Sequence, residues 1–440
     1  MPRPSEMTRT RWSRRRFLGV GAGLASTAAG QSRQPGDTDA EAMVADLERR
    51  LEGDNVYTRL LGIRPHLPGH GTGTRLGGCR MPAEVVSAMQ EANDYFVQMD
   101  ELQVAAGRRA AEVVKAEAAV ITSGGTGALL LGAAACLTGT DMEKMRALPH
   151  PTWARRECII QKAHRYMYDR ALRSAGVTFV EVEGREQLMN ALGESTALLF
   201  GLPRGSAATG VVPPEGLIEI GRRAGVPVMI DGASRLPPEG NLTVFNELGA
   251  DLVALSGGKG LRGPQSTGIL SGRADLIAAA RLQAAPNDQI GRGMKVGKEE
   301  IIGLIVALNR YAALDHATVR RAWRAKADYV AAQLQDVPGL VAVVRGSGEA
   351  APFVELTWDR RVIPLSELEV RNALERRGRR RVGIPMAPVE MRALAGRPEP
   401  GDGSGPVGVN HIQTRSMRDG EEVLVARYLR TFFTEEAPAL

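Results

Sequence analysis

Short apolar segments that alternate with helical segments occupy residues 118–271 and constrain the fold more than any other feature. Runs of four to six apolar residues, bounded by turn residues and separated by helices, are typical of strands buried on both faces of a mostly parallel sheet. We therefore expect an α/β fold with helices on both faces of that sheet. The expected strands are 118–122, 158–161, 177–182, 197–202, 226–230, 251–255 and 268–271.

The pattern changes near residue 299, where longer helical stretches and alternating strands predict a smaller α+β domain. Its expected elements are a long helix over 299–334, strands near 339–345 and 352–358, helices over 366–377 and 419–433, and a flexible loop at 401–406. Residues 82–117 are expected to be helical. The domains predicted are a signal peptide (1–30), a linker and N-terminal segment (31–54), a large domain (55–298) and a small C-terminal domain (299–440).

The first 30 residues carry a separate signal. Six arginines and one acid lie there, and residues 13–18 read Ser-Arg-Arg-Arg-Phe-Leu before a weakly apolar stretch rich in Gly and Ala. This arrangement resembles a twin-arginine signal. We expect recognition by the twin-arginine export machinery and a periplasmic location; a disordered basic tail is the alternative.

The charge outside this segment is nearly balanced. Without these six bases and one acid, the 56 basic and 50 acidic residues fall to 50 and 49, a net charge of +1 instead of +6. We therefore expect no nucleic-acid partner. No apolar run reaches 18 residues, so no membrane span is expected in the mature chain. Three widely spaced cysteines without a CxxC pair predict neither a disulfide framework nor a metal site.

Lys259 is the strongest candidate for chemistry. It stands in Ser-Gly-Gly-Lys-Gly directly after the expected strand 251–255, and the chain has only seven lysines. An amine at the end of a buried strand, among small residues, is partly desolvated, which lowers its pKa and favours Schiff-base formation. A phosphate-binding P-loop does not fit, because Val253 and Gly260 stand where that motif needs Gly and Ser or Thr. A solvated loop lysine is the other alternative.

Two further features suit the same site. Asp231 ends the expected strand 226–230, where a carboxylate is able to keep a pyridine nitrogen protonated; a helix-capping aspartate is the alternative. Residues 123–127 read Ser-Gly-Gly-Thr-Gly between a strand and a helix, and such a turn suits a phosphate. A dinucleotide site fits less well, because Asp141 lies outside any expected strand.

A phosphate-binding turn, a carboxylate for a ring nitrogen and an amine for a carbonyl match pyridoxal 5′-phosphate (PLP). The chain resembles the fold-type I PLP-dependent enzymes, and within them the selenocysteine synthase-like family of L-seryl-tRNA(Sec) selenium transferases, which includes the D-glucosaminate-6-phosphate ammonia-lyase type. The resemblance covers residues 55–435. It rests on the segments 71–78 (GTGTRLGG), 122–126 (TSGGT), 163–165 (AHR), 230–233 (IDGA), 256–259 (SGGK), 263–265 (GPQ) and 291–300 (GRGMKVGKEE).

The resemblance implies a large domain with a mostly parallel, seven-stranded type of sheet and a Schiff base between PLP and Lys259. It implies catalytic roles for Lys259 and Asp231, with Asp231 at the ring nitrogen and His164 over the ring face; a capping or surface role is the alternative for His164. The remaining cofactor contacts implied are Ser123, Gly124, Gly125, Thr126, Ser256 and Gln265.

Candidates for an anionic substrate lie in the glycine-rich segments. They are Thr74, Arg75, Arg292 and Lys295, and structural ion pairs are the alternative for the three cations. The basic cluster 376–381 favours a solvated helix end over contact with tRNA. Since active sites of fold-type I enzymes usually lie at a dimer interface, we expect a homodimer or higher homo-oligomer.

The expected activity is that of a PLP-dependent lyase of the ammonia-lyase type. It would act on a small amine-bearing substrate, an amino acid or amino sugar acid, by removing its Cα proton with Lys259 and eliminating a β-substituent. The alternatives are a selenium transferase acting on seryl-tRNA, an aminotransferase, and a catalytically silent PLP-fold binding protein. The export signal and the short segment before the core disfavour the first of these.

Overall fold

The computed structural model describes residues 37–206, 209–376, 381–385 and 407–437. Its largest element is a seven-stranded sheet in the order β2-β8-β7-β6-β5-β3-β4, in which β8 is antiparallel to both neighbours and the other pairs are parallel. All seven predicted strands are present. They are β2 (Ala118–Ser123), β3 (Glu157–Gln161), β4 (Thr178–Val182), β5 (Thr196–Gly201), β6 (Val228–Asp231), β7 (Leu252–Ser256) and β8 (Thr267–Gly272).

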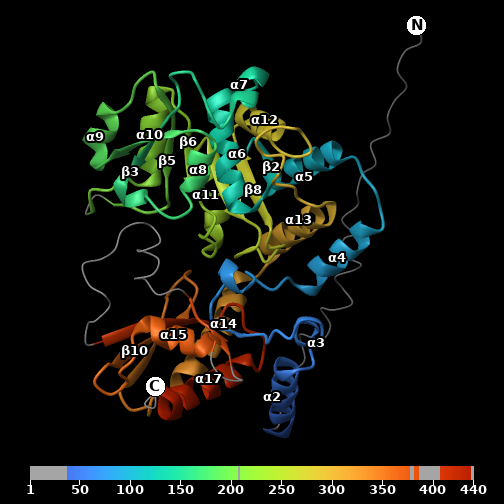
Figure 1. Cartoon of the computed structure of the whole chain (residues 1–440), viewed down its shortest axis with the longest axis vertical. Coiled ribbons are helices and arrows are strands. Elements are labelled where there is room, and N and C mark those ends of the chain that lie inside the picture. The colour runs from blue at the N-terminus through green and yellow to red at the C-terminus, as the bar shows by residue number, and fades with distance from the viewer. Residues whose placement is uncertain (1–36, 207–208, 377–380, 386–406, 438–440) are drawn as a thin grey trace.

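Helices cover both faces of this sheet (Figure 1), as the apolar runs predict. Successive strand residues point to opposite faces: Val253 and Leu255 join one buried cluster, whereas Leu252 and Ala254 join the other. The first cluster includes α5 (Met99–Val114), α9 (Gly184–Asn190), α10 (Pro214–Ala224), α11 (Val244–Glu247) and α13 (Lys298–Ala313). The second includes α6 (Gly124–Thr138), α8 (Arg170–Ser174) and α12 (Ala274–Gln283), with α7 (Met142–Ala147) beside it.

Two of the expected helical stretches are broken. Residues 82–117 form α4 (Ala83–Asn93) and α5, and residues 299–334 form α13 and α14 (His316–Ala332). A β-carbon on Gly303 of α13 would lie 2.7 Å from Met89 of α4, whereas one on Gly107 of α5 would lie 2.1 Å from the Ala119 carbonyl of β2. The first break therefore lets each half pack closely against a different element.

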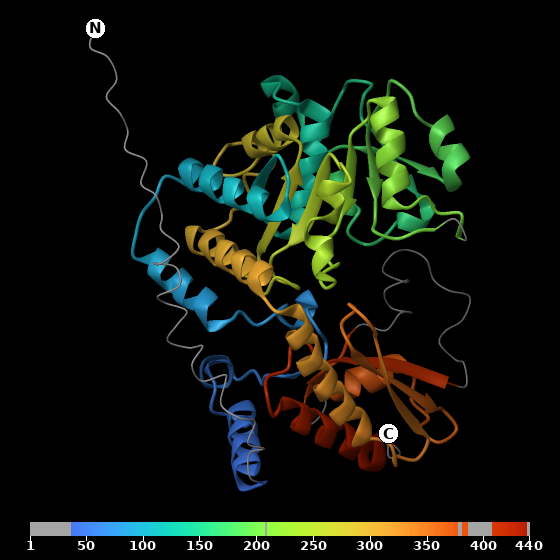
Figure 2. The ribbon, with the colours of Figure 1, turned by 180° about the vertical axis from the view of Figure 1, so that it is seen from behind.

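The second break carries the chain from the large sheet to a smaller unit (Figure 2). Asp315 begins α14 by accepting a hydrogen bond from the Thr318 N–H, the usual role of aspartate at a helix N-cap. Ala327, Val330 and Ala331 of α14 then pack into the core of the smaller unit. The helix thus ties the two units together.

The smaller unit is an α+β arrangement around an antiparallel sheet in the order β12-β10-β9. Its strands are β9 (Leu340–Arg345), β10 (Phe353–Asp359) and β12 (Val407–Gln413), and its helices include α15 (Glu367–Arg376) and α17 (Glu421–Thr431). Strand β12 is not among the expected elements. Val44 of α2 (Asp37–Glu52) and Leu67 of β1 (Leu67–Pro68) also pack in this core, so residues before the large sheet contribute to the smaller unit.

Short elements complete the described chain. Strand β1 pairs in parallel with β11 (Val382–Gly383). The others are α3 (Val56–Leu61), η2 (Thr74–Leu76), η3 (Lys162–His164), η5 (Glu239–Leu242) and η6 (Phe432–Glu436). The signal segment 1–30 and the loop 401–406 lie outside the described residues. Among those described, no helix is long and apolar enough to cross a membrane, and no three His, Cys, Asp or Glu side chains gather as metal ligands.

Candidate active site

The fold brings Asp231 and Lys259 together at one edge of the large sheet. Asp231 ends β6 and is in register with Ala254 of β7, and the turn that follows β7 carries Lys259. Within that turn, the Gly263 N–H donates to the Gly257 carbonyl at 2.8 Å. A β-carbon on Gly258 would lie 2.4 Å from the Gln265 Cα, so the turn depends on glycine there.

The amine of Lys259 has an altered pKa. Burial lowers the pKa, the Asp231 carboxylate opposes this, and the Arg415 guanidinium lowers it further. The Nζ atom lies 5.9 Å from the centre of the Tyr168 ring and has no hydrogen bond or ion pair with any described residue. The lower pKa enlarges the fraction of free amine, which is the nucleophilic form.

The Asp231 carboxylate has a hydrogen-bond donor on each oxygen. The Ala233 N–H donates to Oδ1 at 2.8 Å, and the Tyr166 hydroxyl donates to Oδ2. A carboxylate oxygen accepts two hydrogen bonds, so Asp231 keeps acceptor positions for a ligand. It is therefore able to bind a protonated ring nitrogen.

The start of α6 lies beside these residues. A β-carbon on Gly125 would lie 2.9 Å from the Ala233 Cβ and 3.9 Å from the Ser256 Cβ, so the helix start meets the ends of β6 and β7. The Ser123 side chain makes no capping hydrogen bond, so it does not occupy the N–H groups of the first turn, and Thr126 is exposed. Free N–H groups and the positive end of a helix suit a phosphate. The expected residues 123–126 and Ser256 are thus next to Asp231 and Lys259.

Gln265 lies on the outer side of the Lys259 turn. Its side chain is exposed and donates from Nε2 to the Thr74 carbonyl at 3.3 Å. A β-carbon on Gly78 would lie 2.9 Å from the Gln265 Cγ. Gln265 therefore connects the lysine turn to the glycine-rich segment 71–78.

His164 is buried and hydrogen-bonds with the main chain. Its Nδ1 accepts a hydrogen bond from the Leu202 N–H at 3.3 Å, and its Nε2 lies 3.2 Å from the Arg204 carbonyl as a donor. Burial lowers the pKa of His164 to about 4, so the ring is neutral. Both ring nitrogens are satisfied by the main chain, and the side chain does not line the cavity at Lys259.

Two aromatic residues from the same loop were not among the predicted site residues. Tyr168 lines the cavity at Lys259, and Tyr166 contacts Asp231. The sequence signal was the dense aromatic stretch Tyr166-Met167-Tyr168, immediately after the histidine that we singled out.

The cavity at Lys259 has a volume of about 410 Å³ and lies between the large and small units. Arg415, which follows β12, enters it from the small unit; its side chain is largely enclosed, and its Nε has no partner among the described residues. Its nearest polar contact is the Thr72 hydroxyl at 3.4 Å from Nη2. The lining consists of His70, Thr72, Gly73, Thr74, Arg75, Leu76, Met167, Tyr168, Ser234, Leu236, Lys259, Ile384, Pro385, Gln413 and Arg415.

The predicted substrate cations lie in different environments. Arg75 lines the cavity but forms a two-pronged ion pair with the buried Glu375, the structural role left open by the sequence. Arg292 and Lys295 are exposed, lie outside the cavity lining and have no ion pair with a described residue. Their loop contacts α6, since a β-carbon on Gly127 would lie 3.8 Å from the Met294 sulfur.

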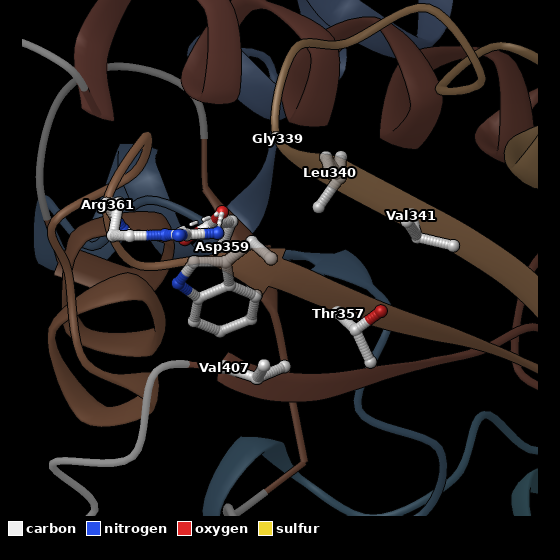
Figure 3. Close-up of a pocket in the computed structure, with 8 residues that line it drawn as sticks. Gly339, Leu340, Val341, Thr357, Asp359, Arg361 and Val407 are labelled. Atoms are coloured by element: carbon white, nitrogen blue, oxygen red, sulfur yellow. Dashed lines mark hydrogen bonds and ion pairs between the residues drawn. The ribbon is translucent and has the colours of Figure 1, made fainter.

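A larger hollow of about 650 Å³ lies on the small sheet (Figure 3). Its charged lining residues, Asp359 and Arg361, pair with each other. It contains neither a lysine nor an unpaired charge. The cavity at Lys259 is therefore the candidate active site.

Comparisons with known proteins show which proteins this chain is similar to. Residues 179–358 match the family described as Aminotransferase class-V. The 5′-C-glycyluridine monooxygenase-decarboxylase of a Streptomyces species is 34% identical over 307 residues, which cover 67% of this chain and 75% of that protein. The D-glucosaminate-6-phosphate ammonia lyase of Salmonella typhimurium is 28% identical over 302 residues, covering 66% and 76%.

Solved structures of PLP-dependent enzymes are also similar to this chain. A structure of D-glucosaminate-6-phosphate ammonia-lyase superposes with a TM-score of 0.69 at 25% identity and covers 87% of this chain and 99% of that one. L-seryl-tRNA(Sec) selenium transferases also match; that of Moorella thermoacetica is 29% identical over 47% of this chain and 44% of its own length.

Proposed function

Because the chain belongs to the aminotransferase class-V family of PLP-dependent enzymes, we propose that it is a lyase acting on an amino acid or amino sugar acid. It would remove the Cα proton and eliminate a β-substituent, with a keto product and ammonia as the final products. One observation carries the proposal: a single cavity holds the Lys259 amine and the Arg415 guanidinium, which has no carboxylate partner among the described residues. An amine-bearing acid is the ligand that complements both.

The residues at the sheet edge fit PLP. The start of α6 would bind its phosphate, the Asp231 carboxylate would face its ring nitrogen, and Lys259 would meet its carbonyl carbon. Glycine at position 125 lets the helix start approach Ala233 closely, because a β-carbon there would lie only 2.9 Å from the Ala233 Cβ. When bound, PLP supplies a carbonyl for the substrate amine and an electron-withdrawing ring that stabilises negative charge at Cα.

Lys259 would carry the proton. A lysine with a lowered pKa spends more time as the free amine, the form able to accept a proton from Cα. The Tyr168 ring beside Nζ shields the amine on one side from water. The same amine would return the proton to the departing group or to the product.

Arg415 would hold the substrate carboxylate. A largely enclosed guanidinium binds a carboxylate by charge-assisted hydrogen bonds and so orients Cα toward Lys259. This ion pair stabilises the carboxylate in the ground state and therefore opposes its loss as CO₂. The contact favours proton removal over decarboxylation, the reaction in the name of the Streptomyces relative.

Similarity to that relative nevertheless makes oxidative decarboxylation the second candidate. Transfer of selenium to seryl-tRNA is less well supported, because the chain carries a net charge of only +1 outside residues 1–30. An aminotransferase would leave the amino group on the cofactor instead of releasing ammonia. A catalytically silent protein would bind PLP without forming any product.

These candidates differ in their products. The purified chain with PLP should be incubated with hydroxylated amino acids and amino sugar acids, under air and under argon, and ammonia, keto acid, CO₂ and O₂ should be measured. A lyase releases ammonia and keto acid equally under both gases. CO₂ release that requires O₂ would overturn the proposal in favour of decarboxylation, and activity retained by Lys259→Ala would refute the role of the lysine.

We also propose twin-arginine export to the periplasm and assembly into at least a homodimer. The sequence of residues 13–18 supports export, and a reporter fusion should lose export when Arg14 and Arg15 are both changed to Lys. Exposed apolar side chains on α3 and at Phe96 support assembly, because such clusters commonly mark interfaces. Light scattering of the purified chain would give the mass, and a monomer would contradict the second proposal.

A further inference from the structure

Tyr166 reaches Asp231 from a different part of the sheet. It lies in the loop after β3, beyond η3, and its hydroxyl donates to Oδ2 of Asp231. The Ala233 N–H, from the chain directly after β6, donates to Oδ1. The carboxylate is therefore fixed from two directions, and free acceptor positions remain for a further donor.

The ring of Tyr166 is held between two other aromatic rings. The Phe200 ring of β5 lies 6.2 Å away and nearly parallel, at an interplanar angle of 15°. The Tyr168 ring lies 5.8 Å away at 68°, an edge-on contact. Phe200 is 1% exposed, so it provides a rigid wall that restricts Tyr166 to one orientation.

The loop that carries Tyr166 is fixed by a buried carboxylate. Asp169, which is 3% exposed, accepts hydrogen bonds from the Tyr166 N–H at 3.1 Å and from the Arg165 Nε at 2.6 Å. Main chain and side chain of Tyr166 are thus both constrained. The hydrogen bond from the fixed Tyr166 hydroxyl in turn restricts the orientation of the Asp231 carboxylate.

The phenol acts only as a donor to Asp231. Burial and the nearby Asp231 charge hold the pKa of the Tyr166 hydroxyl well above its usual range. The hydroxyl therefore keeps its proton over the working pH range. A hydrogen bond from a neutral phenol to a carboxylate is charge-assisted and is stronger than one between neutral groups.

We propose that Tyr166 is a positioning residue that orients the Asp231 carboxylate toward the ring nitrogen of PLP and so helps to set cofactor affinity. The inference rests on the role of Asp231 proposed above. Tyr166 acts through Asp231 and has no contact with the cavity at Lys259. The effect of the Tyr166 hydroxyl on PLP affinity should therefore vanish when the Asp231 carboxylate is replaced.

The first test is Tyr166→Phe, which removes only the hydroxyl. The full-length chain is freed of cofactor and titrated with PLP, and the absorption of the bound cofactor is followed against pH. We expect the dissociation constant to rise about tenfold, equivalent to ~1.4 kcal/mol, and the pH midpoint of the absorption to move. Tyr311→Phe is the control: Tyr311 is buried, and its hydroxyl has no partner among the described residues, so PLP affinity should stay unchanged.

A double-mutant cycle distinguishes positioning from a general loss of structure. In an Asp231→Asn background, Tyr166→Phe should change PLP affinity less than twofold. An equal tenfold loss in that background, or wild-type affinity of the single variant, would overturn the inference. If Asp231→Asn alone leaves PLP affinity unchanged, the proposed role of Asp231 is refuted, independently of the result for Tyr166.

Asp169→Asn provides a test that does not depend on the folding of Tyr166→Phe. It keeps the tyrosine but removes the charge that anchors the loop through Arg165. We expect PLP affinity to fall about threefold, with the same direction of shift in the pH midpoint. A folded Asp169→Asn protein that binds PLP as the wild type does would refute positioning through the loop.

Discussion

Replacing Arg415 with methionine should make the protein more stable and less active. The guanidinium is largely enclosed, and within the described residues its nearest polar contact is the 3.4 Å approach to the Thr72 hydroxyl. A buried charge without a partner costs free energy that an apolar side chain of similar length does not. We expect a gain of about 1 kcal/mol in the free energy of unfolding, because the cost of keeping the charge away from water is removed.

The same substitution should remove the group that binds the substrate carboxylate. Charge-assisted hydrogen bonds contribute about 1.5–3 kcal/mol each, so losing the contact should lower kcat/KM by about 100-fold or more. An amine that lacks the carboxylate should show no such loss, which assigns the effect to that group.

The assay pairs thermal unfolding at saturating PLP with ammonia release. Arg361→Met is the control, because Arg361 is exposed, pairs with Asp359 at the end of β10 and does not line the cavity at Lys259. A lower unfolding temperature for Arg415→Met, or unchanged kcat/KM, would refute the argument that the guanidinium is held unpaired for an anionic substrate.

Three further predictions concern the same site. The rate at which the cofactor-free chain binds PLP should rise with pH, with a midpoint below the ordinary lysine pKa of 10.5, because binding needs the free amine of Lys259. Arg415→Met should move that midpoint upward, because it removes a nearby cation. Stopped-flow absorption measures both midpoints. Gly125→Ala should weaken PLP binding, because the new methyl group would lie 2.9 Å from the Ala233 Cβ and displace the helix start; a titration that gives wild-type affinity would contradict this. Arg75→Met should destabilise the protein by about 3 kcal/mol, because it leaves the buried Glu375 carboxylate without its partner; chemical denaturation checks this, and Glu375→Gln with Arg75 retained should cost less.

The sheet could be predicted because its strands are buried on both faces. Runs such as residues 252–255 are apolar throughout, so they stand out from amphipathic helices. Strand β12 was not predicted, because its sequence mixes apolar and polar residues on both faces. Val407 and His411 face outward, whereas Ile412 packs in the core. The breaks were not predicted because the apolar periodicity continues across Asp94 and Asp315. Packing separates α4 from α5, and the Asp315 cap begins α14.

The site was predictable where one motif carries the chemistry. Asp231 ends β6 and Lys259 follows the end of β7, and neighbouring parallel strands bring such ends together. Arg415 could not be singled out among the 56 basic residues, because its importance comes from enclosure by distant segments. His164 was chosen by its position after a strand. Its ring hydrogen-bonds with the main chain of Leu202 and Arg204, and Tyr168 of the same loop lines the cavity.

The most direct test of the account is to treat the PLP-loaded protein with borohydride and to map the reduced adduct by mass spectrometry. The proposed role of Lys259 predicts that reduction abolishes the cofactor's visible absorption and leaves the pyridoxyl group on this residue. An adduct on any of the other six lysines, or no adduct with the absorption unchanged, would contradict it.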